Sequence, residues 1–402
     1  MRKVLLGACA RRGLADAPLR PSRRSLCSIP LPFDALTGGV PQRLSRRKML
    51  RQSMDLRLPE EAYPAARAIR RTIHAHLGPT NSGKTHAALN ALRVADSGVY
   101  CGPLRLLAWE VHDRLSSDGL PCILRTGQEV SEPEGGSEHT SCTIEMASVR
   151  QVVDVAVIDE IQMLSHPDRG WAWSRAFFGL PACEVHVCGS ADALELIQAL
   201  AEACGDVLVI HTYERLTPLT VAPSSLGGDL SHVRPGDCVV AFSRREIFGL
   251  KQLVEERTGL ACGVVYGSLP PETRREQARR FNDPAASQQV LIASDAIGMG
   301  LNLNIQRIVF ASAHKFDGVK VLPLEPTEVK QIGGRAGRYR TQFAIGEVTA
   351  LHEADLHVLR RAMDAPLAPI RQSGLSPKCE PRPRTPLARP RAFAHPPACG
   401  HR

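Results

Sequence analysis

The chain has 402 residues, 43% of them hydrophobic, which suffices for about two domains with buried cores, while an aromatic content of 4% argues against a recognition surface built mainly from stacked rings. The formal charge of +9 is concentrated at the ends of the chain: residues 1–50 carry 11 basic and 2 acidic side chains, and residues 371–402 carry 7 basic and 1 acidic. Residues 51–370 have a net charge of −6, so any nucleic-acid contact must come from a local groove. The 12 cysteines include no CxxC pair, and no apolar run reaches the ~18 residues of a spanning helix, which argues against a zinc framework, a disulfide scaffold and a membrane protein.

The first 30 residues have the composition of a targeting segment. They are rich in Arg and Ser and contain one acid, Asp16. Such a start is typical of a mitochondrial transit peptide, and composition alone leaves an untargeted basic arm as the alternative. We predict a transit peptide over 1–30, an N-terminal extension over 31–70, and residence in the mitochondrial matrix, with the nucleus as a further compartment.

Residues 71–214 alternate between short apolar runs and longer amphipathic stretches. The alternation predicts a first α/β domain with a parallel sheet covered by helices on both faces. Strands are predicted at 72–77, 98–101, 153–158, 184–188 and 207–211, and helices at 85–95 and 104–116.

A second alternating set occupies residues 215–366. It opens with 216–236, which is dense in Pro, Gly and Ser and is interpreted as an interdomain connection or a long loop. The fold class is therefore α/β with two tandem parallel-sheet domains, and the Pro- and Arg-rich tail 367–402 is predicted to be disordered. The second domain's strands are predicted at 238–242, 261–266, 289–294, 307–311 and 346–351, and its helices at 244–257 and 271–281.

The most specific motif is a loop that follows the first predicted strand and opens the first predicted helix. Its glycines allow backbone N–H groups to close around phosphate oxygens, and the helix N-terminus adds a positive dipole. We expect Lys84 to bridge the β- and γ-phosphates of ATP and the Thr85 hydroxyl to bind Mg²⁺. The loop consists of Gly78, Pro79, Thr80, Asn81, Ser82, Gly83, Lys84 and Thr85.

Two further motifs supply the remaining parts of a hydrolysis site. An apolar strand ends in Asp159, expected to hold Mg²⁺, and Glu160, expected to polarise the attacking water. The block QIGGRAGR at 331–338 supplies Arg335 and Arg338, whose charge would stabilise the transferring phosphoryl group when the domains close. An acidic strand end or a basic loop touching RNA or solvent is common, so both assignments depend on the phosphate loop.

Ten sequence blocks in order resemble the superfamily-two helicases, and within them the mitochondrial degradosome RNA helicases of the Suv type. The resemblance runs from about His76 to Gln372, and its acidic block reads DEIQ, as in this family. It implies two RecA-like domains with an ATP cleft between them, use of Mg²⁺, 3′-to-5′ movement on RNA with some activity on DNA, and association with a mitochondrial exoribonuclease. The blocks include GPTNSGKT (78–85), RTGQE (125–129), VIDEIQM (157–163), CGSADA (188–193), SDAIGMGLN (294–302) and QIGGRAGR (331–338).

The resemblance also implies roles for individual residues. Gln331 and Gly300 would lie on the nucleotide side, and the block at 190–192 would couple hydrolysis to domain movement. An RNA track of this kind grips phosphates through hydroxyls, N–H groups and a few arginines without reading sequence. The residues implied for it are Arg105, Thr126, Gly127, Ser243, Arg244 and Asp295.

Family members usually continue beyond the second domain into a helical region, whereas here the match stops near Gln372. Two hypotheses therefore stay open. The chain is either an RNA-stimulated ATPase that unwinds duplexes, or a shortened form that binds ATP and RNA without processive unwinding. A P-loop kinase or transferase is disfavoured because it explains neither the GGRAGR block nor the second α/β unit.

Overall fold

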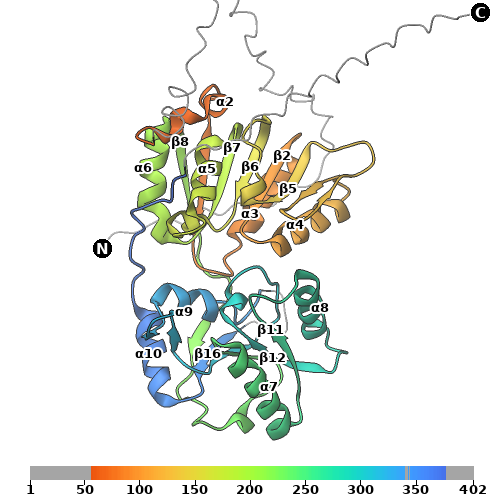
Figure 1. Ribbon diagram of the computed structural model, residues 1–402, viewed down its shortest axis with the longest axis vertical. Coiled ribbons are helices and arrows are strands. Elements are labelled where there is room, and N and C mark those ends of the chain that lie inside the picture. Colours follow the sequence, from red (N-terminus) through yellow and green to blue (C-terminus); the bar gives the residue numbers. More distant parts are fainter. Residues whose placement is uncertain (1–55, 340–342, 344, 377–402) are drawn as a thin grey trace, which may run out of the picture. The chain divides into compact units, whose positions relative to one another are not determined.

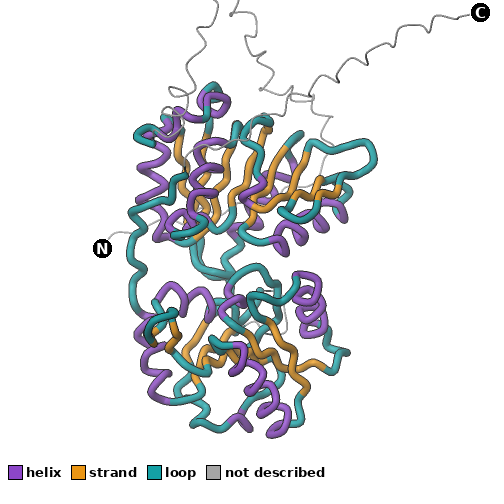
Figure 2. The backbone as a smooth tube through the Cα atoms, in the orientation of Figure 1, coloured by secondary structure: helices purple, strands orange, loops and turns teal. Residues whose placement is uncertain are grey.

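The computed structural model describes residues 56–339, 343 and 345–376. The predicted transit peptide, residues 31–55 of the extension and residues 377–402 of the tail lie outside the described residues. The described chain forms two α/β lobes, each with its own sheet, as the sequence predicts (Figures 1 and 2).

The first lobe contains an eight-stranded sheet in the order β4-β3-β5-β2-β6-β7-β1-β8. Every pairing is parallel except that of β3 with β4. The strands are β1 (Thr72–Leu77), β2 (Gly98–Gly102), β3 (Ile123–Arg125), β4 (Val130–Ser131), β5 (His139–Thr143), β6 (Val153–Ile158), β7 (Ala182–Gly189) and β8 (Val207–Thr212). The helices are α2 (Pro64–Arg67), α3 (Lys84–Val94), α4 (Arg105–Ser117), α5 (Gly170–Gly179) and α6 (Leu194–Cys204), with 3₁₀ turns η2 (Pro59–Ala62), η3 (Ile144–Met146), η4 (Ile161–Ser165) and η5 (Ala191–Ala193).

Helices cover both faces of this sheet. On one face, Ile73 and Val185 pack with Trp173 and Phe177 of α5. On the other face, side chains of α3 and α4 pack against β2 and β6. Burial on both faces is why β2 and β6 appear in the sequence as continuous apolar runs rather than alternating ones.

The second lobe contains a six-stranded, wholly parallel sheet in the order β11-β12-β10-β13-β16-β9. Successive residues of β10 enter opposite cores, with Val240 on the side of α9 and α10 and Val239 on the side of α7. Its elements are β9 (Leu219–Val221), η6 (Leu230–His232), β10 (Asp237–Val240), α7 (Arg244–Thr258), β11 (Ala261–Val265), α8 (Pro271–Asn282), β12 (Gln288–Ala293), η7 (Asp295–Gly298), β13 (Arg307–Phe310), β14 (His314–Phe316), β15 (Val321–Pro323), α9 (Pro326–Gly333), β16 (Gly346–Ala350) and α10 (Glu353–Asp364).

Two sequence predictions need correction. The segment 216–236 is not only a connection, because β9 within it forms the edge strand of the second sheet beside β16. The first part of the predicted disordered tail is also ordered. Residues 367–376 return to the first lobe, where Ile370 N–H donates to Asp192 O (2.9 Å) and Gly374 N–H to Leu164 O (2.8 Å).

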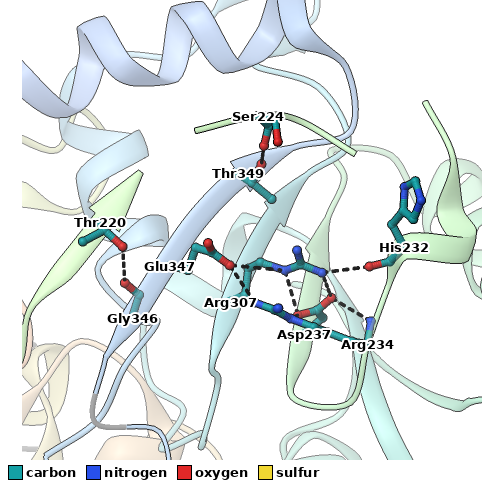
Figure 3. Close-up of polar contacts among 9 residues, drawn as sticks. All are labelled: Thr220, Ser224, His232, Arg234, Asp237, Arg307, Gly346, Glu347 and Thr349. Carbon is teal, nitrogen blue, oxygen red and sulfur yellow. Dashed lines mark hydrogen bonds and ion pairs between the residues drawn. The ribbon is translucent and has the colours of Figure 1, made fainter. Parts of the chain in front are cut away.

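A buried ion pair connects three strands of the second lobe (Figure 3). Arg307 on β13 reaches Asp237 on β10 with Nη2···Oδ2 at 2.6 Å and Nε···Oδ1 at 3.0 Å. Arg307 also donates to His232 O at 3.0 Å, while Glu347 on β16 accepts from Arg234 at 2.7 Å. Beside this pair, the Thr349 hydroxyl donates to Ser224 O at 3.0 Å and so holds the segment before β10 against β16.

Candidate nucleotide-binding site

The phosphate-binding loop occupies the turn between β1 and α3. Gly78 N–H donates to Gly189 O on β7 at 3.1 Å, which anchors the start of the loop to the sheet. A β-carbon at Gly78 would lie 2.5 Å from the Tyr213 carbonyl oxygen, so only glycine fits there. Gly83 precedes α3 with a φ of 81°, the left-handed conformation that glycine adopts without strain.

Two side chains of the loop are suited to a phosphate group. Ser82 is buried, and its hydroxyl has no hydrogen-bond partner among the described residues. Lys84 begins α3, and its ammonium group donates back to Pro79 O at 2.9 Å. A buried donor and an ammonium group beside a helix N-terminus match what phosphate oxygens require.

The acidic pair lies beside this loop. Asp159 follows β6 and is buried, with Oδ1 accepting from the Thr85 hydroxyl at 3.3 Å and Oδ2 from the Tyr100 hydroxyl at 3.1 Å. Burial, followed by the negative charge of Glu160, raises the pKa of Asp159 to about 6. A divalent cation at Thr85 and Asp159 would favour the ionised carboxylate, and the oxygen ligands fit Mg²⁺.

Glu160 is held in an unusual conformation next to the Asp159 carboxylate. Its φ of 52° is positive, and Asn81 of the phosphate loop is the one other non-glycine residue with positive φ in the described chain. The Glu160 carboxylate accepts a hydrogen bond from Gln162, whose Oε1 in turn accepts from Ser190 N–H at 3.3 Å. The structure thus connects Glu160 to the 190–192 block through Gln162. Sequence analysis gave Gln162 no role, although it is the last residue of the DEIQ block.

The arginine loop follows α9. Arg335 donates from Nε to Gly298 O at 3.0 Å. Burial lowers the pKa of Arg335, and the negative charges of Glu160 and Asp159 oppose that effect. Burial also lowers the pKa of Arg338. The acidic pair and the arginine loop are therefore close enough to influence one another electrostatically.

Hydrogen bonds join the arginine loop to the phosphate loop. The Asn81 amide donates to Gly337 O, and Thr217 Oγ1 donates to the same carbonyl at 3.0 Å. Arg215, which follows β8, donates to Thr80 O at 3.2 Å and to Gly334 O at 2.8 Å. Sequence analysis did not single out Arg215, because one arginine in a connecting segment carries no motif.

The residues implied for RNA fall into separate groups. On the first lobe, the Arg105 guanidinium donates to Gln128, and Thr126 Oγ1 accepts from Glu129 N–H at 3.2 Å, so Arg105 and the 126–129 loop lie together. On the second lobe, Ser243 caps α7 by accepting from Glu246 N–H at 3.2 Å, and the Arg244 guanidinium lies 5.6 Å from the Tyr266 ring centre.

Gly127, Asp295, Gly300 and Gln331 complete the predicted set. Gly127 and Asp295 are exposed. Gly300 has a φ of 77°, and a β-carbon there would lie 2.6 Å from Leu104 Cδ1, next to Arg105. A β-carbon at Gly298 would lie 3.4 Å from Gln331, which places Gln331 beside the backbone that Arg335 contacts.

These features define a class of protein. A parallel-sheet lobe with a phosphate loop and an acidic strand end, followed by a second lobe with an arginine loop, is the core of a two-lobe P-loop helicase. Residues 59–213 match the family described as the DEXQ-box helicase domain of Suv3, and residues 223–340 match the helicase conserved C-terminal domain. The chain belongs to the Suv3 family.

Curated relatives agree with this assignment. A rice protein (Oryza sativa subsp. japonica), the mitochondrial ATP-dependent RNA helicase SUV3L, is 49% identical over 334 residues, which are 83% of this chain and 45% of the relative. The human mitochondrial ATP-dependent RNA helicase SUPV3L1 is 47% identical over 339 residues, 82% of this chain and 43% of the relative. The chain thus spans about half the length of the curated relatives it matches.

Solved structures support the fold alone. Yeast (S. cerevisiae) Dbp5 bound to RNA and ADP BeF3 superposes with a TM-score of 0.53 at 13% identity, covering 75% of this chain and 85% of that chain. A second Dbp5 structure gives a TM-score of 0.54 at 15% identity, over 73% of this chain and 81% of that chain. No described helix has the length and apolarity needed to cross a membrane.

Proposed function

We propose that this chain is an ATP-dependent RNA helicase core of the mitochondrial Suv3 type. The observation that supports it most is the junction of the three motifs: Asn81 of the phosphate loop donates to Gly337 of the arginine loop, and Thr85 donates to Asp159. The names of the rice and human relatives, both mitochondrial ATP-dependent RNA helicases, support the substrate, the nucleotide and the compartment.

In the proposed mechanism, Lys84 releases Pro79 O and binds the β- and γ-phosphates, while the loop's N–H groups and the Ser82 hydroxyl donate to phosphate oxygens. Thr85 and Asp159 would hold Mg²⁺, which neutralises charge on the phosphates when bound. Glu160 orients and polarises the attacking water, since its carboxylate is fixed by Gln162. The Trp173 indole N–H donates to Asp159 O at 2.9 Å and so holds the backbone between Asp159 and Glu160.

The proposed role of Arg335 and Arg338 is to stabilise charge on the transferring phosphoryl group. Arg335 is already oriented by Gly298 O, so little rearrangement is needed when nucleotide binds. Hydrolysis breaks the bond between the β- and γ-phosphates, and release of the freed phosphate then removes the negative charge that attracts the arginines, which weakens the contact between the loops. Ser190, linked to Glu160 through Gln162, is placed to transmit this change along the first lobe.

RNA contact is proposed for Arg105 with the 126–129 loop on one lobe and for Ser243, Arg244 and Asp295 on the other. None of these contacts would read bases, which suits a motor acting on many transcripts. Movement in the 3′-to-5′ direction, activity on DNA and association with a mitochondrial exoribonuclease belong to the same proposal. They rest on the family assignment.

The test is ATP hydrolysis with and without single-stranded RNA, together with unwinding of a 3′-tailed RNA duplex. We expect RNA to stimulate hydrolysis and Lys84→Ala to abolish hydrolysis and unwinding. Arg361→Ala, at an exposed position on α10, is the control and should retain both activities. RNA-stimulated hydrolysis without unwinding would support the alternative of an ATP- and RNA-binding form that does not unwind. Hydrolysis unaffected by Lys84→Ala would contradict the nucleotide site.

A further inference from the structure

Four histidines gather on one face of the first sheet, where β1, β7 and β8 are neighbours. His74 is the register partner of His186, and His76 is the register partner of His211. The opposite face of the same strands packs into the apolar core beside α5 and α6. Four imidazoles on one sheet face are a concentration of metal-binding groups that the nucleotide site does not use.

The imidazole rings are ordered by contacts with one another. His74 Nδ1 lies 3.1 Å from His211 Nε2, and His76 Nε2 lies 2.9 Å from His186 Nδ1. The rings of His74 and His186 are stacked at 4.7 Å between centroids. Each ring is therefore held in a fixed orientation before any ligand arrives.

These contacts direct particular nitrogens toward a carboxylate. The Nδ1 atom of His186 contacts His76, and its Nε2 atom lies 3.4 Å from Glu184 Oε2. His74 uses Nδ1 toward His211, which leaves Nε2 as its ligand atom. One ligand atom from each of His74, Glu184 and His186 lies within 4.8 Å of the others, and no other group of three His, Cys, Asp or Glu side chains in the described chain meets that criterion.

We propose that His74, Glu184 and His186 form a binding site for a divalent transition-metal ion of the zinc type. Two imidazoles and one carboxylate are the protein ligands of a familiar class of zinc site, in which water occupies the remaining position. His76 positions His186 through the Nδ1 hydrogen bond, as partners of metal-bound histidines commonly do. Mg²⁺ prefers oxygen ligands, so the site is chemically distinct from the one at Thr85 and Asp159.

The burial gradient of the site suits entry of an ion from solvent. His186 is 5% exposed and His74 is half-buried, whereas the Glu184 side chain is 51% exposed. A purely structural stack of histidines would not require the exposed carboxylate.

The experiment titrates Zn²⁺, and Co²⁺ as a spectroscopic probe, into the chelator-treated full chain near neutral pH. We expect one ion per chain, visible ligand-field absorption without thiolate charge transfer, and no competition from excess Mg²⁺. His74→Asn and Glu184→Gln should each weaken Zn²⁺ binding by about 10-fold or more. His357→Asn is the matched control, because His357 on α10 is exposed and also has a glutamate nearby, at 3.9 Å.

The unfolding midpoints of the metal-free variants show whether each is folded. Glu184→Gln is the decisive variant, because its exposed, isosteric side chain can change without disturbing the core. The proposal is overturned if wild type binds no more tightly than Glu184→Gln, if His357→Asn loses the ion, or if thiolate charge transfer assigns the ion to cysteines.

Discussion

Glu160 has a backbone conformation that residues other than glycine rarely adopt, with φ and ψ both 52°. Asn81 shares the left-handed region with a φ of 62°, and both residues lie in the proposed site. Such conformations cost about 1–3 kcal/mol each and persist where surrounding contacts fix them. At Glu160 those contacts include Glu160 N–H donating to Asp159 Oδ1 at 2.9 Å and the Gln162 amide at the carboxylate. Together these contacts hold the backbone of Glu160 in this conformation and fix its carboxylate against Gln162.

Glu160→Gln should therefore separate ATP binding from hydrolysis. The amide keeps the shape of the side chain but cannot accept a proton, so we expect the ATPase rate to fall by about 100-fold or more, with ATP affinity nearly unchanged. Single-turnover hydrolysis and equilibrium binding of a fluorescent ATP analogue measure the two effects. Glu195→Gln, an exposed change on α6, is the control for general effects of losing a carboxylate. A hydrolysis rate within about twofold of wild type would remove Glu160 from the mechanism.

At the scale of elements, the ion pair of Asp237 and Arg307 holds the starts of β10 and β13 together. The side chain of Asp237 is fully buried and that of Arg307 is 9% exposed. Removing one partner leaves the other buried without its counter-charge, whereas replacing both by apolar groups does not. Glu347 on β16 lies beside the pair, with its Oε2 3.9 Å from Arg307 Nε (Figure 3).

Arg307→Ala should lower the free energy of unfolding of the second lobe by about 3–5 kcal/mol. Arg234→Ala is the control: its side chain is 48% exposed and contacts the same acids, and it should cost less than about 1 kcal/mol. The double change Arg307→Met with Asp237→Leu should recover most of the loss. Urea unfolding followed by far-ultraviolet circular dichroism measures all three. If Arg307→Ala and Arg234→Ala lower the free energy of unfolding equally, the burial of Arg307 does not determine how much its ion pair contributes to stability.

The histidines on β1 and β7 give the first lobe a pH dependence in the presence of a chelator. Burial lowers the pKa of His76 to about 3 and that of His186 to about 4, below the value of 6.5 expected in the unfolded chain. The unfolded state therefore binds more protons between pH 6.5 and 4, so stability is present above that range and falls as the pH drops. As the pH falls from 7 to 5, each of these two histidines should lower the free energy of unfolding of the first lobe by about 2 kcal/mol.

Unfolding of the first lobe at several pH values measures this loss. His76→Gln should flatten the dependence, while His357→Gln on α10 should leave it unchanged. A first lobe equally stable at pH 7 and pH 5 would contradict the lowered pKa values.

At the scale of the whole molecule, the sequence predicted the two lobes because most strands are buried on both faces and appear as apolar runs. It missed β5, whose polar residues are buried with their own partners: Ser141 Oγ donates to Ala108 O at 2.7 Å, and His139 lies 3.2 Å from Leu92 O. It missed β3, β4 and β9 because none exceeds three residues. Strands of that length are specified by their neighbours in the sheet rather than by their own pattern.

The candidate nucleotide site was predictable where it consists of motifs. Thr85 and Asp159 belong to motifs with a fixed relation to strand and helix, and the structure brings the two side chains into hydrogen-bond contact. Arg215 and Tyr100 could not be found in this way, because neither belongs to a recognisable motif. Composition wrongly predicted disorder for residues 367–376. It does not reveal that backbone N–H groups in this segment donate hydrogen bonds to carbonyl groups of the first lobe.

That returning segment permits a test of how the end of the described chain contributes to the first lobe. A β-carbon at Gly374 would lie 2.7 Å from Trp171 N, at the start of α5, so Gly374→Ala must displace the segment and its hydrogen bond to Leu164 O. We expect Gly374→Ala to lower the free energy of unfolding of the first lobe by about 1–3 kcal/mol. Leu375→Ala, at an exposed position, should change this free energy by less than about 0.5 kcal/mol. All three tryptophans belong to the first lobe, so their fluorescence during urea unfolding reports on that lobe. If Gly374→Ala is as stable as Leu375→Ala, residues 367–376 are not part of the first lobe's cooperative unit.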